Sequence, residues 1–374
     1  MDASAFLDCL IDQKVSFFAG VPDSYLHGFC SELRRRDDIL NVVAANEGNA
    51  VAVAVGHHLS TGSVPLVYMQ NSGLGNAVNP LASLACKPML GIPTILLIGW
   101  RGDPWHPDHV QHELQGKATP KMLDDLGIPY RVLGEEGLAA GEASEWAVSE
   151  ARTIGAPVAL LAPKGVLGGT KKQAADNSYP LSREEAISAV LDAAPSNALF
   201  CATTGRASRE LFHLRESRGE GHSLDYLNVG SMGHASSVAL GLAFGEPGRR
   251  IVCLDGDAAA IMHMGALAVI PSLGAPNLLH IVLNNGAHES VGGQPSVGWE
   301  IDLTSVAEAC GYETVGRPVS DAEAIASAVS ELFGCGKTAF LDVRIHSGMR
   351  PGIPELEVDP AAMRNGIMEG LGAK

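Results

Sequence analysis

Three features are absent from this 374-residue sequence. It has no uncharged apolar run of the length that a membrane-spanning helix needs, roughly 18 residues. Its first residues lack a basic segment followed by an apolar one, so we expect no signal peptide. Its seven cysteines are scattered and form no CxxC pair. These absences predict a protein that does not cross a membrane and keeps reduced cysteines in the cytoplasm.

Basic clusters are absent as well. The formal net charge is −16, from 26 Lys and Arg against 42 Asp and Glu. This charge excludes a nucleic acid or an anionic membrane as the expected partner. A small anionic substrate would need a local group of cations or a metal ion, because the overall field does not attract it. The composition, 46% hydrophobic and 18% charged, predicts a globular protein of about two domains.

Apolar runs alternate with helical patterns along the chain, which predicts parallel sheets with crossover helices. The strand-like runs are residues 16–19, 41–45, 65–69, 94–98, 198–202, 251–254, 278–283 and 339–345. Residues 167–181 are largely polar and aperiodic, which predicts a linker. We therefore expect two doubly wound α/β domains, 1–166 and 182–374, with no central third domain. Ser182 and Glu185 predict a capping box at the start of the second.

Carboxylates and amides follow two of these runs. The run 251–254 ends in Asp255-Gly256-Asp257, before a predicted helix over 258–273, and the run 278–283 ends in Asn284-Asn285. Neighbouring parallel strands present their carboxyl ends at one edge, where open α/β sheets bind ligands. Oxygen donors there suit Mg²⁺ bound to phosphate, and a helix N-terminus favours a diphosphate. An ordinary turn with a capping aspartate is the simpler alternative.

This Gly-Asp turn with Asn-Asn at the next strand end resembles the signature of the thiamine diphosphate enzymes. The resemblance implies a first domain that binds the pyrimidine of the cofactor and a second that binds its diphosphate. It also implies three Mg²⁺ ligands, namely Asp257, Asn285 and the carbonyl of Ala287. The turn itself would contact the cofactor through Gly256, Asp257, Ala258 and Ala259, with Asp255 shaping it.

Two further segments fit this resemblance. Glu47 precedes a helix of alanines and valines, where burial raises the pKa of a carboxyl group. In the family such a glutamate shares a proton with the aminopyrimidine of the cofactor; a helix cap is the alternative. The glycine-rich turn in 228–243 opens another helix. By resemblance, the Gly230 carbonyl accepts from the cofactor and Met232 wedges against it, although Met232 also suits ordinary core packing.

Six motifs extend the resemblance over nearly the whole chain. They are GVPDS (20–24), QNSGLGN (70–76), GWRGD (99–103), TTGRASRE (203–210), GSMGHASS (230–237) and NNGAHESVGGQPSVG (284–298). Together they resemble the thiamine diphosphate-dependent decarboxylases that act on phosphonopyruvate or sulfopyruvate. The implied reaction is nonoxidative decarboxylation of 3-phosphonopyruvate to phosphonoacetaldehyde and CO₂, in phosphonate biosynthesis. The family also implies a homodimer or higher homo-oligomer with active sites between chains. The segment 108–116 departs from the family pattern at His109 and Val110.

Residues that handle the substrate are predicted from the loops after the strands. Asp23 and His112 are candidate proton carriers, with His106 and His109 nearby, unless these histidines only decorate a solvated loop. Arg101 and Arg206 offer guanidinium groups to the phosphonate. Asn71 and Ser72 are placed to reach cofactor or substrate. Three alternatives remain: a sulfopyruvate decarboxylase, a noncatalytic cofactor-binding subunit, and a Rossmann oxidoreductase, for which the full glycine fingerprint is lacking.

Overall fold

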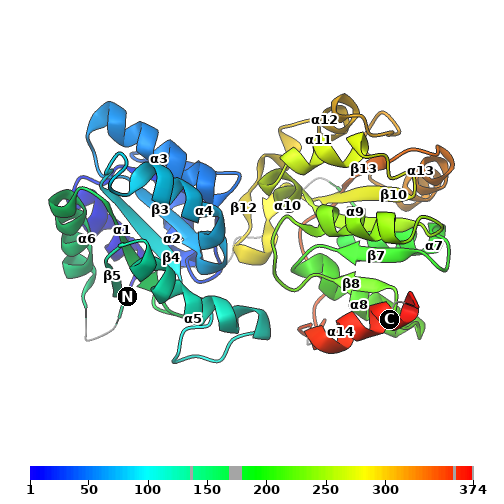
Figure 1. Cartoon of the computed structure of the whole chain (residues 1–374), viewed down its shortest axis with the longest axis horizontal. Helices are drawn as coiled ribbons and strands as arrows, with labels where there is room; N and C mark the ends of the chain where they lie inside the picture. The colour runs from blue at the N-terminus through cyan, green and yellow to red at the C-terminus, as the bar shows by residue number, and fades with distance from the viewer. Residues whose placement is uncertain (135–137, 168–178, 357–358, 373–374) are drawn as a thin grey trace. The chain divides into compact units, whose positions relative to one another are not determined.

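The structure is a computed structural model that describes residues 1–134, 138–167, 179–356 and 359–372. The chain forms two compact units (Figure 1). Unit 1 is Met1–Gln173 with Val291–Gln294, and unit 2 is Ala174–Ser290 with Pro295–Lys374. The predicted linker falls mostly on 168–178, outside the described residues, so the predicted domain limits stay a prediction. Among the described residues, no helix is long and apolar enough to cross a membrane.

Unit 1 is built on a six-stranded sheet in which every pairing is parallel. Its strands are β1 (Phe17–Gly20), β2 (Leu40–Val43), β3 (Leu66–Gln70), β4 (Thr94–Gly99), β5 (Tyr130–Val132) and β6 (Pro157–Ala162). Their order in the sheet is β2-β1-β3-β4-β6-β5. Its helices are α1 (Ala3–Asp12), α2 (His27–Arg35), α3 (Glu47–Thr61), α4 (Leu74–Pro80), α5 (Val110–Asp125) and α6 (Ala140–Ile154).

Helices cover both faces of this sheet, because side chains alternate along each strand. Phe18, with its neighbours on that face, joins a hydrophobic cluster with α1, α2 and α6. Phe17 and Ala19 point the other way, into a second cluster with α3, α4 and α5. The two clusters confirm the doubly wound arrangement for this half of the chain.

Unit 2 repeats the plan with a five-stranded parallel sheet. Its strands are β7 (Leu199–Ala202), β8 (Asp225–Leu227), β9 (Ile251–Gly256), β10 (Leu278–Asn284) and β13 (Ala339–Arg344), in the order β13-β10-β9-β7-β8. Its helices are α7 (Arg183–Ala193), α8 (Arg206–Arg218), α9 (Ala235–Gly245), α10 (Asp257–Met262), α11 (Gly265–Ser272), α12 (Leu303–Cys310), α13 (Ala322–Gly334) and α14 (Pro360–Gly370). Two short strands, β11 (Ala287–His288) and β12 (Gln294–Pro295), follow β10. One hydrophobic cluster includes α7, α8 and α13, and another includes α9, α11 and α12.

All eight predicted strands are present, within a few residues of their expected limits. The sequence patterns missed β5, β6 and β8. β5 and β8 are three-residue strands at the ends of the two sheets, too short to show a repeating pattern. β6 is buried along its whole length. Periodicity alone does not distinguish such a continuous apolar run from a buried helix.

One helix prediction was wrong and one cap prediction was right. The single helix expected over 258–273 is two helices, α10 and α11, because His263 leaves the helical region with φ −126° and ψ 45°. Its ring instead stacks on that of His234, with centroids 4.2 Å apart. The capping box is confirmed: Ser182 Oγ accepts from Glu185 N at 3.1 Å, and Glu185 Oε2 accepts from Ser182 N at 2.9 Å.

Candidate active site

In unit 1 the predicted polar residues gather at one edge of the sheet. The adjacent strands β1, β3 and β4 end at Gly20, Gln70 and Gly99, so the loops after them share that edge. Asp23 follows β1, and Asn71 and Ser72 follow β3. The strand order thus explains why residues far apart in the sequence meet here.

Asp23 is fully buried and belongs to a short polar chain. Its Oδ1 accepts from Gln70 Nε2 at 2.6 Å, and its Oδ2 accepts from Tyr25 N at 3.0 Å. Ser72 Oγ donates to the other end of the Gln70 amide. A Cβ at Gly99 would lie 2.0 Å from Asp23 Oδ2, so only glycine leaves room for the carboxylate. Burial raises the pKa of Asp23 against the lowering effect of these hydrogen bonds.

Glu47 is the first residue of α3 and is also fully buried. The helix cap is its neighbour Asn46, whose side chain accepts from Asn49 N at 3.0 Å, so capping does not explain Glu47. Glu47 Oε2 accepts from Asn76 Nδ2 at 2.8 Å, whereas Oε1 is buried and has no hydrogen-bond partner among the described residues. Burial raises the pKa of this carboxyl group. The side chain therefore holds its proton more tightly than an exposed glutamate does and keeps one oxygen available for a ligand.

Arg101 is paired within its own unit. Its Nε and NH2 donate to the two oxygens of Asp108 at 2.8 and 2.6 Å, and its guanidinium lies 4.6 Å from the centre of the Tyr25 ring. His112 Nδ1 lies 2.9 Å from Asp108 Oδ1. Burial, followed by the charge of Arg101, lowers the pKa of His112. Arg101, Asp108 and His112 therefore form one cluster, and Asp108 orients both of its partners.

Asn71 has a structural partner for each end of its amide. Its Nδ2 donates to the Arg101 carbonyl at 2.9 Å and to Thr119 Oγ1 at 3.0 Å, while its Oδ1 accepts from Arg101 N at 3.1 Å. The side chain is buried and clamps the backbone after β4. In this arrangement Asn71 shapes the site rather than offering a free group to a substrate.

In unit 2 the two predicted metal ligands lie together. Asp257 begins α10 directly after β9, and Asn285 follows the adjacent strand β10. The Asn285 backbone N–H is among the donors to the Asp257 carboxylate, and Ser296 Oγ is another. Burial raises the pKa of Asp257 to about 6. A Cβ at Gly298 would lie 2.5 Å from Asp257 Oδ2. A buried, crowded carboxylate beside an amide is a donor set that fits Mg²⁺.

The turns around this pair are held by further side chains. Asp255 is buried, accepts from Gly256 N at 2.9 Å and lies 3.3 Å from His280 Nε2. It therefore holds the turn before Asp257, as expected. Ala287 N donates to Asn285 Oδ1 at 3.1 Å.

The predicted turn between β8 and α9 is bracketed by the Asn228 side chain. Its Nδ2 donates to the Ser231 carbonyl at 3.1 Å, and its Oδ1 accepts from Gly230 N at 3.1 Å. Met232 is half-buried, beside the N-terminus of α9. Gly230 and Met232 therefore lie in the same turn, whose backbone is held by the Asn228 side chain.

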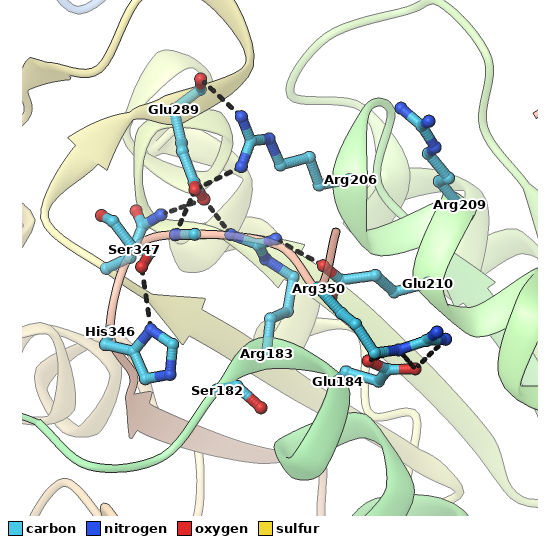
Figure 2. A network of polar contacts seen from close by, with 12 residues as sticks. Ser182, Arg183, Glu184, Arg206, Arg209, Glu210, Glu289, His346, Ser347 and Arg350 are labelled. Atoms are coloured by element: carbon cyan, nitrogen blue, oxygen red, sulfur yellow. Dashed lines mark hydrogen bonds and ion pairs between the residues drawn. The ribbon is translucent and has the colours of Figure 1, made fainter. Parts of the chain in front are cut away.

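Arg206 also has a carboxylate partner. Its NH1 donates to Glu289, on which Arg183 converges from the other side (Figure 2). Arg183 NH1 also donates to Glu210 Oε1 at 3.1 Å. Burial raises the pKa of Glu210 to about 7 and lowers that of Arg206. Both arginines that the sequence offered to a substrate are therefore engaged in ion pairs within the chain.

Several residues of these sites were not singled out from the sequence. Gln70, Asp108, Ser296 and Glu289 all lie in or beside motifs that drew attention, but each makes contacts that sequence spacing does not reveal. Their common signal is position: Gln70 is the last residue of β3, and the other three lie in the segments that follow β4 or the Asn-Asn turn. Glu289, four residues after Asn285, is the clearest example.

The chain matches two family models. Residues 3–122 match the model "Thiamine pyrophosphate enzyme, N-terminal TPP binding domain", and residues 203–343 match "Thiamine pyrophosphate enzyme, C-terminal TPP binding domain". Thiamine pyrophosphate is another name for thiamine diphosphate. The chain belongs to the thiamine pyrophosphate enzymes, and more narrowly to the family of the phosphonopyruvate decarboxylases described next.

Similarity to these decarboxylases extends over nearly the whole chain. It is 33% identical to phosphonopyruvate decarboxylase of Streptomyces hygroscopicus, over 94% of this chain and 88% of that protein. It is 31% identical to phosphonopyruvate decarboxylase of Streptomyces viridochromogenes, over 93% and 89%. Sulfopyruvate decarboxylase of Methanosarcina acetivorans is 28% identical, over 88% and 87%. The resemblance predicted from the sequence motifs, including the class of decarboxylase, is confirmed.

Proposed function

We propose that this chain decarboxylates 3-phosphonopyruvate to phosphonoacetaldehyde and CO₂, without oxidation. The observation behind the proposal is the similarity to two phosphonopyruvate decarboxylases over almost the full length of all three proteins. The loss of CO₂ is effectively irreversible and would draw an unfavourable synthesis of phosphonopyruvate forward. We therefore assign the reaction to phosphonate biosynthesis.

Asp257, Asn285 and the carbonyl of Ala287 would hold Mg²⁺, and the backbone of Gly256, Ala258 and Ala259 would lie against the cofactor diphosphate. The buried Asp257 carboxylate supports this, since a bound cation would compensate the charge that burial disfavours. Thiamine diphosphate supplies the electron-accepting ring that makes loss of CO₂ from a 2-oxo acid possible. Gly230 and Met232 would contact the same cofactor.

Glu47 would bind and release the proton that activates the cofactor. Its raised pKa and unpartnered Oε1 suit an acid that holds its proton and donates it to a nearby nitrogen. Asp23 is a second buried acid and candidate proton carrier, and its hydrogen bond from Gln70, which in turn accepts from Ser72, fixes its orientation. His112, oriented by Asp108, is the remaining candidate proton carrier.

The anionic groups of the substrate would be bound by residues at the two sheet edges. Arg206 has five N–H donors and uses NH1 on the Glu289 carboxylate and NH2 on the Glu289 carbonyl at 3.5 Å, so it retains capacity for a phosphonate. Arg101 donates through two nitrogens to Asp108 and through a third to Ser24, so it has fewer N–H groups left for a phosphonate. Asn71 would hold the backbone of Arg101 in place through its two hydrogen bonds to it. Ser72 would contact substrate or cofactor directly. We also propose a homodimer or higher homo-oligomer in the cytoplasm, with active sites between chains.

Sulfopyruvate is the alternative substrate. The chain is 28% identical to a sulfopyruvate decarboxylase over most of both proteins, and the two substrates differ mainly by one negative charge. A noncatalytic cofactor-binding subunit is less consistent with the structure, because such a subunit has no need for a buried Glu47 with an unpartnered oxygen.

The test is CO₂ release by the purified protein with Mg²⁺ and thiamine diphosphate. Phosphonopyruvate, sulfopyruvate and pyruvate are offered separately, and each assay is repeated without the cofactor. We expect cofactor-dependent release that is fastest with phosphonopyruvate. Faster release from sulfopyruvate would replace the substrate and keep the chemistry. No release from any of the three by folded, cofactor-loaded protein would contradict the proposal.

A further inference from the structure

Glu289 is the meeting point of four separate parts of unit 2. Its Oε1 accepts from Arg206 NH1 and from Gly348 N, and its Oε2 accepts from Arg183 NH2 and from Asn285 Nδ2. Figure 2 shows Glu289 between the two arginines, beside the segment that follows β13. Its side chain is only 11% exposed. All of these partners donate, so the carboxylate accepts at both oxygens and is held in one orientation.

An ionised carboxylate only accepts hydrogen bonds, and this decides which way the Asn285 amide faces. The amide has an accepting oxygen at one end and a donating nitrogen at the other, and the two ends are nearly equal in shape. Asn285 Nδ2 donates to Glu289 Oε2 at 2.8 Å. If the amide turned over, two oxygens would meet at that distance. Glu289 therefore keeps the Asn285 oxygen on the opposite side.

We infer that Glu289 is a positioning residue that presents the Asn285 oxygen to the metal ion. The inference rests on the proposed function, in which Asn285 is a ligand of Mg²⁺. Partners that orient a metal ligand set its direction and its basicity, and their loss commonly weakens metal binding about 10- to 100-fold. Neither Glu289 nor its arginines need to touch the metal or the substrate for this effect.

The two arginines hold the Glu289 carboxylate in its orientation. A guanidinium only donates, so Arg183 and Arg206 fix Glu289 as Glu289 fixes Asn285. Arg183 is itself anchored, because its NH1 donates to the buried Glu210 at 3.1 Å. Gly348 connects the same carboxylate to the segment after β13. The hydrogen bonds therefore converge on Glu289, which accepts from both arginines, from Gly348 N and from the Asn285 amide.

The test measures Mn²⁺ binding in the presence of saturating thiamine diphosphate, from the paramagnetic resonance signal of free Mn²⁺. Glu289→Gln turns an obligate acceptor into a side chain that both donates and accepts, so it no longer dictates the Asn285 orientation. We expect the Mn²⁺ dissociation constant to rise about 10-fold or more. Glu184→Gln is the matched control: it makes the same chemical change in the same network, but Glu184 pairs with Arg350 and not with Glu289. It should leave Mn²⁺ binding unchanged.

A second background distinguishes orientation from general damage. Asn285→Asp keeps an oxygen for the metal but has no N–H to donate to Glu289, so the two carboxylates repel. In that background we expect Glu289→Gln to strengthen Mn²⁺ binding rather than weaken it. Weakening by the same factor in both backgrounds, or no weakening in the otherwise native protein, would overturn the inference.

Three further variants make the result decisive whatever Glu289→Gln does to folding. Arg206→Lys keeps Glu289 and the positive charge but loses the planar donor, and we expect a smaller loss of Mn²⁺ affinity, about threefold. Unchanged affinity in a folded Arg206→Lys protein would count against the arrangement. Asp257→Ala and Asn285→Ala test the metal assignment itself. If both leave Mn²⁺ binding intact, the proposed metal site fails, which differs from failure of the Glu289 inference alone.

Discussion

Each unit contains an arginine–carboxylate cluster at the carboxyl edge of its sheet, and the two behave oppositely toward protons. In unit 1, Asp108 accepts from two nitrogens of Arg101, from backbone N–H groups and from the Tyr25 hydroxyl. Burial opposes ionisation there, but the bonds from Arg101 and His112 outweigh it and hold the pKa of Asp108 well below its usual range. In unit 2, burial of Glu210 outweighs its contact with Arg183 and raises its pKa to about 7.

The two carboxylates differ in how many donor nitrogens of an arginine reach them. Arg101 grips Asp108 through both carboxylate oxygens, whereas Arg183 reaches Glu210 through one oxygen and leaves Glu210 Oε2 buried without a hydrogen-bond partner among the described residues. Arg183 is shared, since its other donor serves Glu289. An ion pair seen in a structure is therefore not enough to predict whether a buried acid is charged.

Glu47 is a third buried carboxylate to compare. Its side-chain donor is the amide of Asn76, and no arginine, lysine or histidine is among the groups that shift its pKa. If few donors mean a high proton affinity, Glu47 is the acid best suited to hold a proton. Glu47→Gln keeps the shape and the Asn76 contact but has no proton to exchange, so we expect kcat for CO₂ release to fall about 1,000-fold. Thiamine diphosphate binding, measured by calorimetry, should change little. If Glu47→Gln releases CO₂ at the native rate, the small number of donors on Glu47 does not indicate a catalytic role.

Asp108→Asn removes the strongly held carboxylate. Arg101, whose side chain is 15% exposed, would be left buried without its partner, and we expect a loss of about 4 kcal/mol in the free energy of unfolding of unit 1. Urea unfolding of the variant measures it. Asp125→Asn, which breaks the exposed pair with Lys121 on the same helix, is the control and should have no measurable effect. Equal effects of the two substitutions would mean that the Asp108 cluster is not specially stabilising.

The pH dependence of stability should separate the clusters. Glu210 has a raised pKa, so its favourable contribution is complete below its ordinary value of 4.5 and is lost as the pH rises through about 7. The stability of the native protein relative to Glu210→Gln should therefore fall by about 3 kcal/mol between pH 4.5 and pH 8. Asp108 has the opposite sign, and its contribution is lost only as the pH falls below 3.8. Thermal unfolding across this pH range measures the Glu210 effect.

Glu184→Gln serves as the control for this pH series as well. Glu184 pairs with the exposed Arg350, and its substitution should change the pH dependence of stability much less than Glu210→Gln does. Parallel stability curves for the native protein and Glu210→Gln would show that Glu210 titrates normally. The comparison between the two clusters would then fail.

Much of the fold was predictable because strands and turns leave local signals. The apolar runs and the Ser182–Glu185 cap were read directly from residue order. The break at His263 was not; the His263 ring stacks on that of His234, and local residue order does not reveal such a contact. The three-residue edge strand β8 and the buried strand β6 lacked a periodic signal of their own.

The site was predictable only in part, for a similar reason. Asp257 and Asn285 follow adjacent strands, so the parallel sheet brings them together. Arg101 and Arg206 were expected to be free for a substrate, because the sequence gives no sign of Asp108 or Glu289 folding back onto them. Whether a charged side chain is free depends on its partners in space, and those partners come from loops whose paths short motifs do not determine.

We propose that the turn at Asp257 and Asn285 is the metal and cofactor centre of this thiamine diphosphate-dependent decarboxylase. The most direct measurement is a crystal structure of the protein with thiamine diphosphate and Mn²⁺, with the ion located by its anomalous signal. We predict Mn²⁺ bound to the Asp257 carboxylate, the Asn285 amide oxygen and the cofactor diphosphate. Mn²⁺ and cofactor bound elsewhere, with Asp257 and Asn285 free of both, would contradict it.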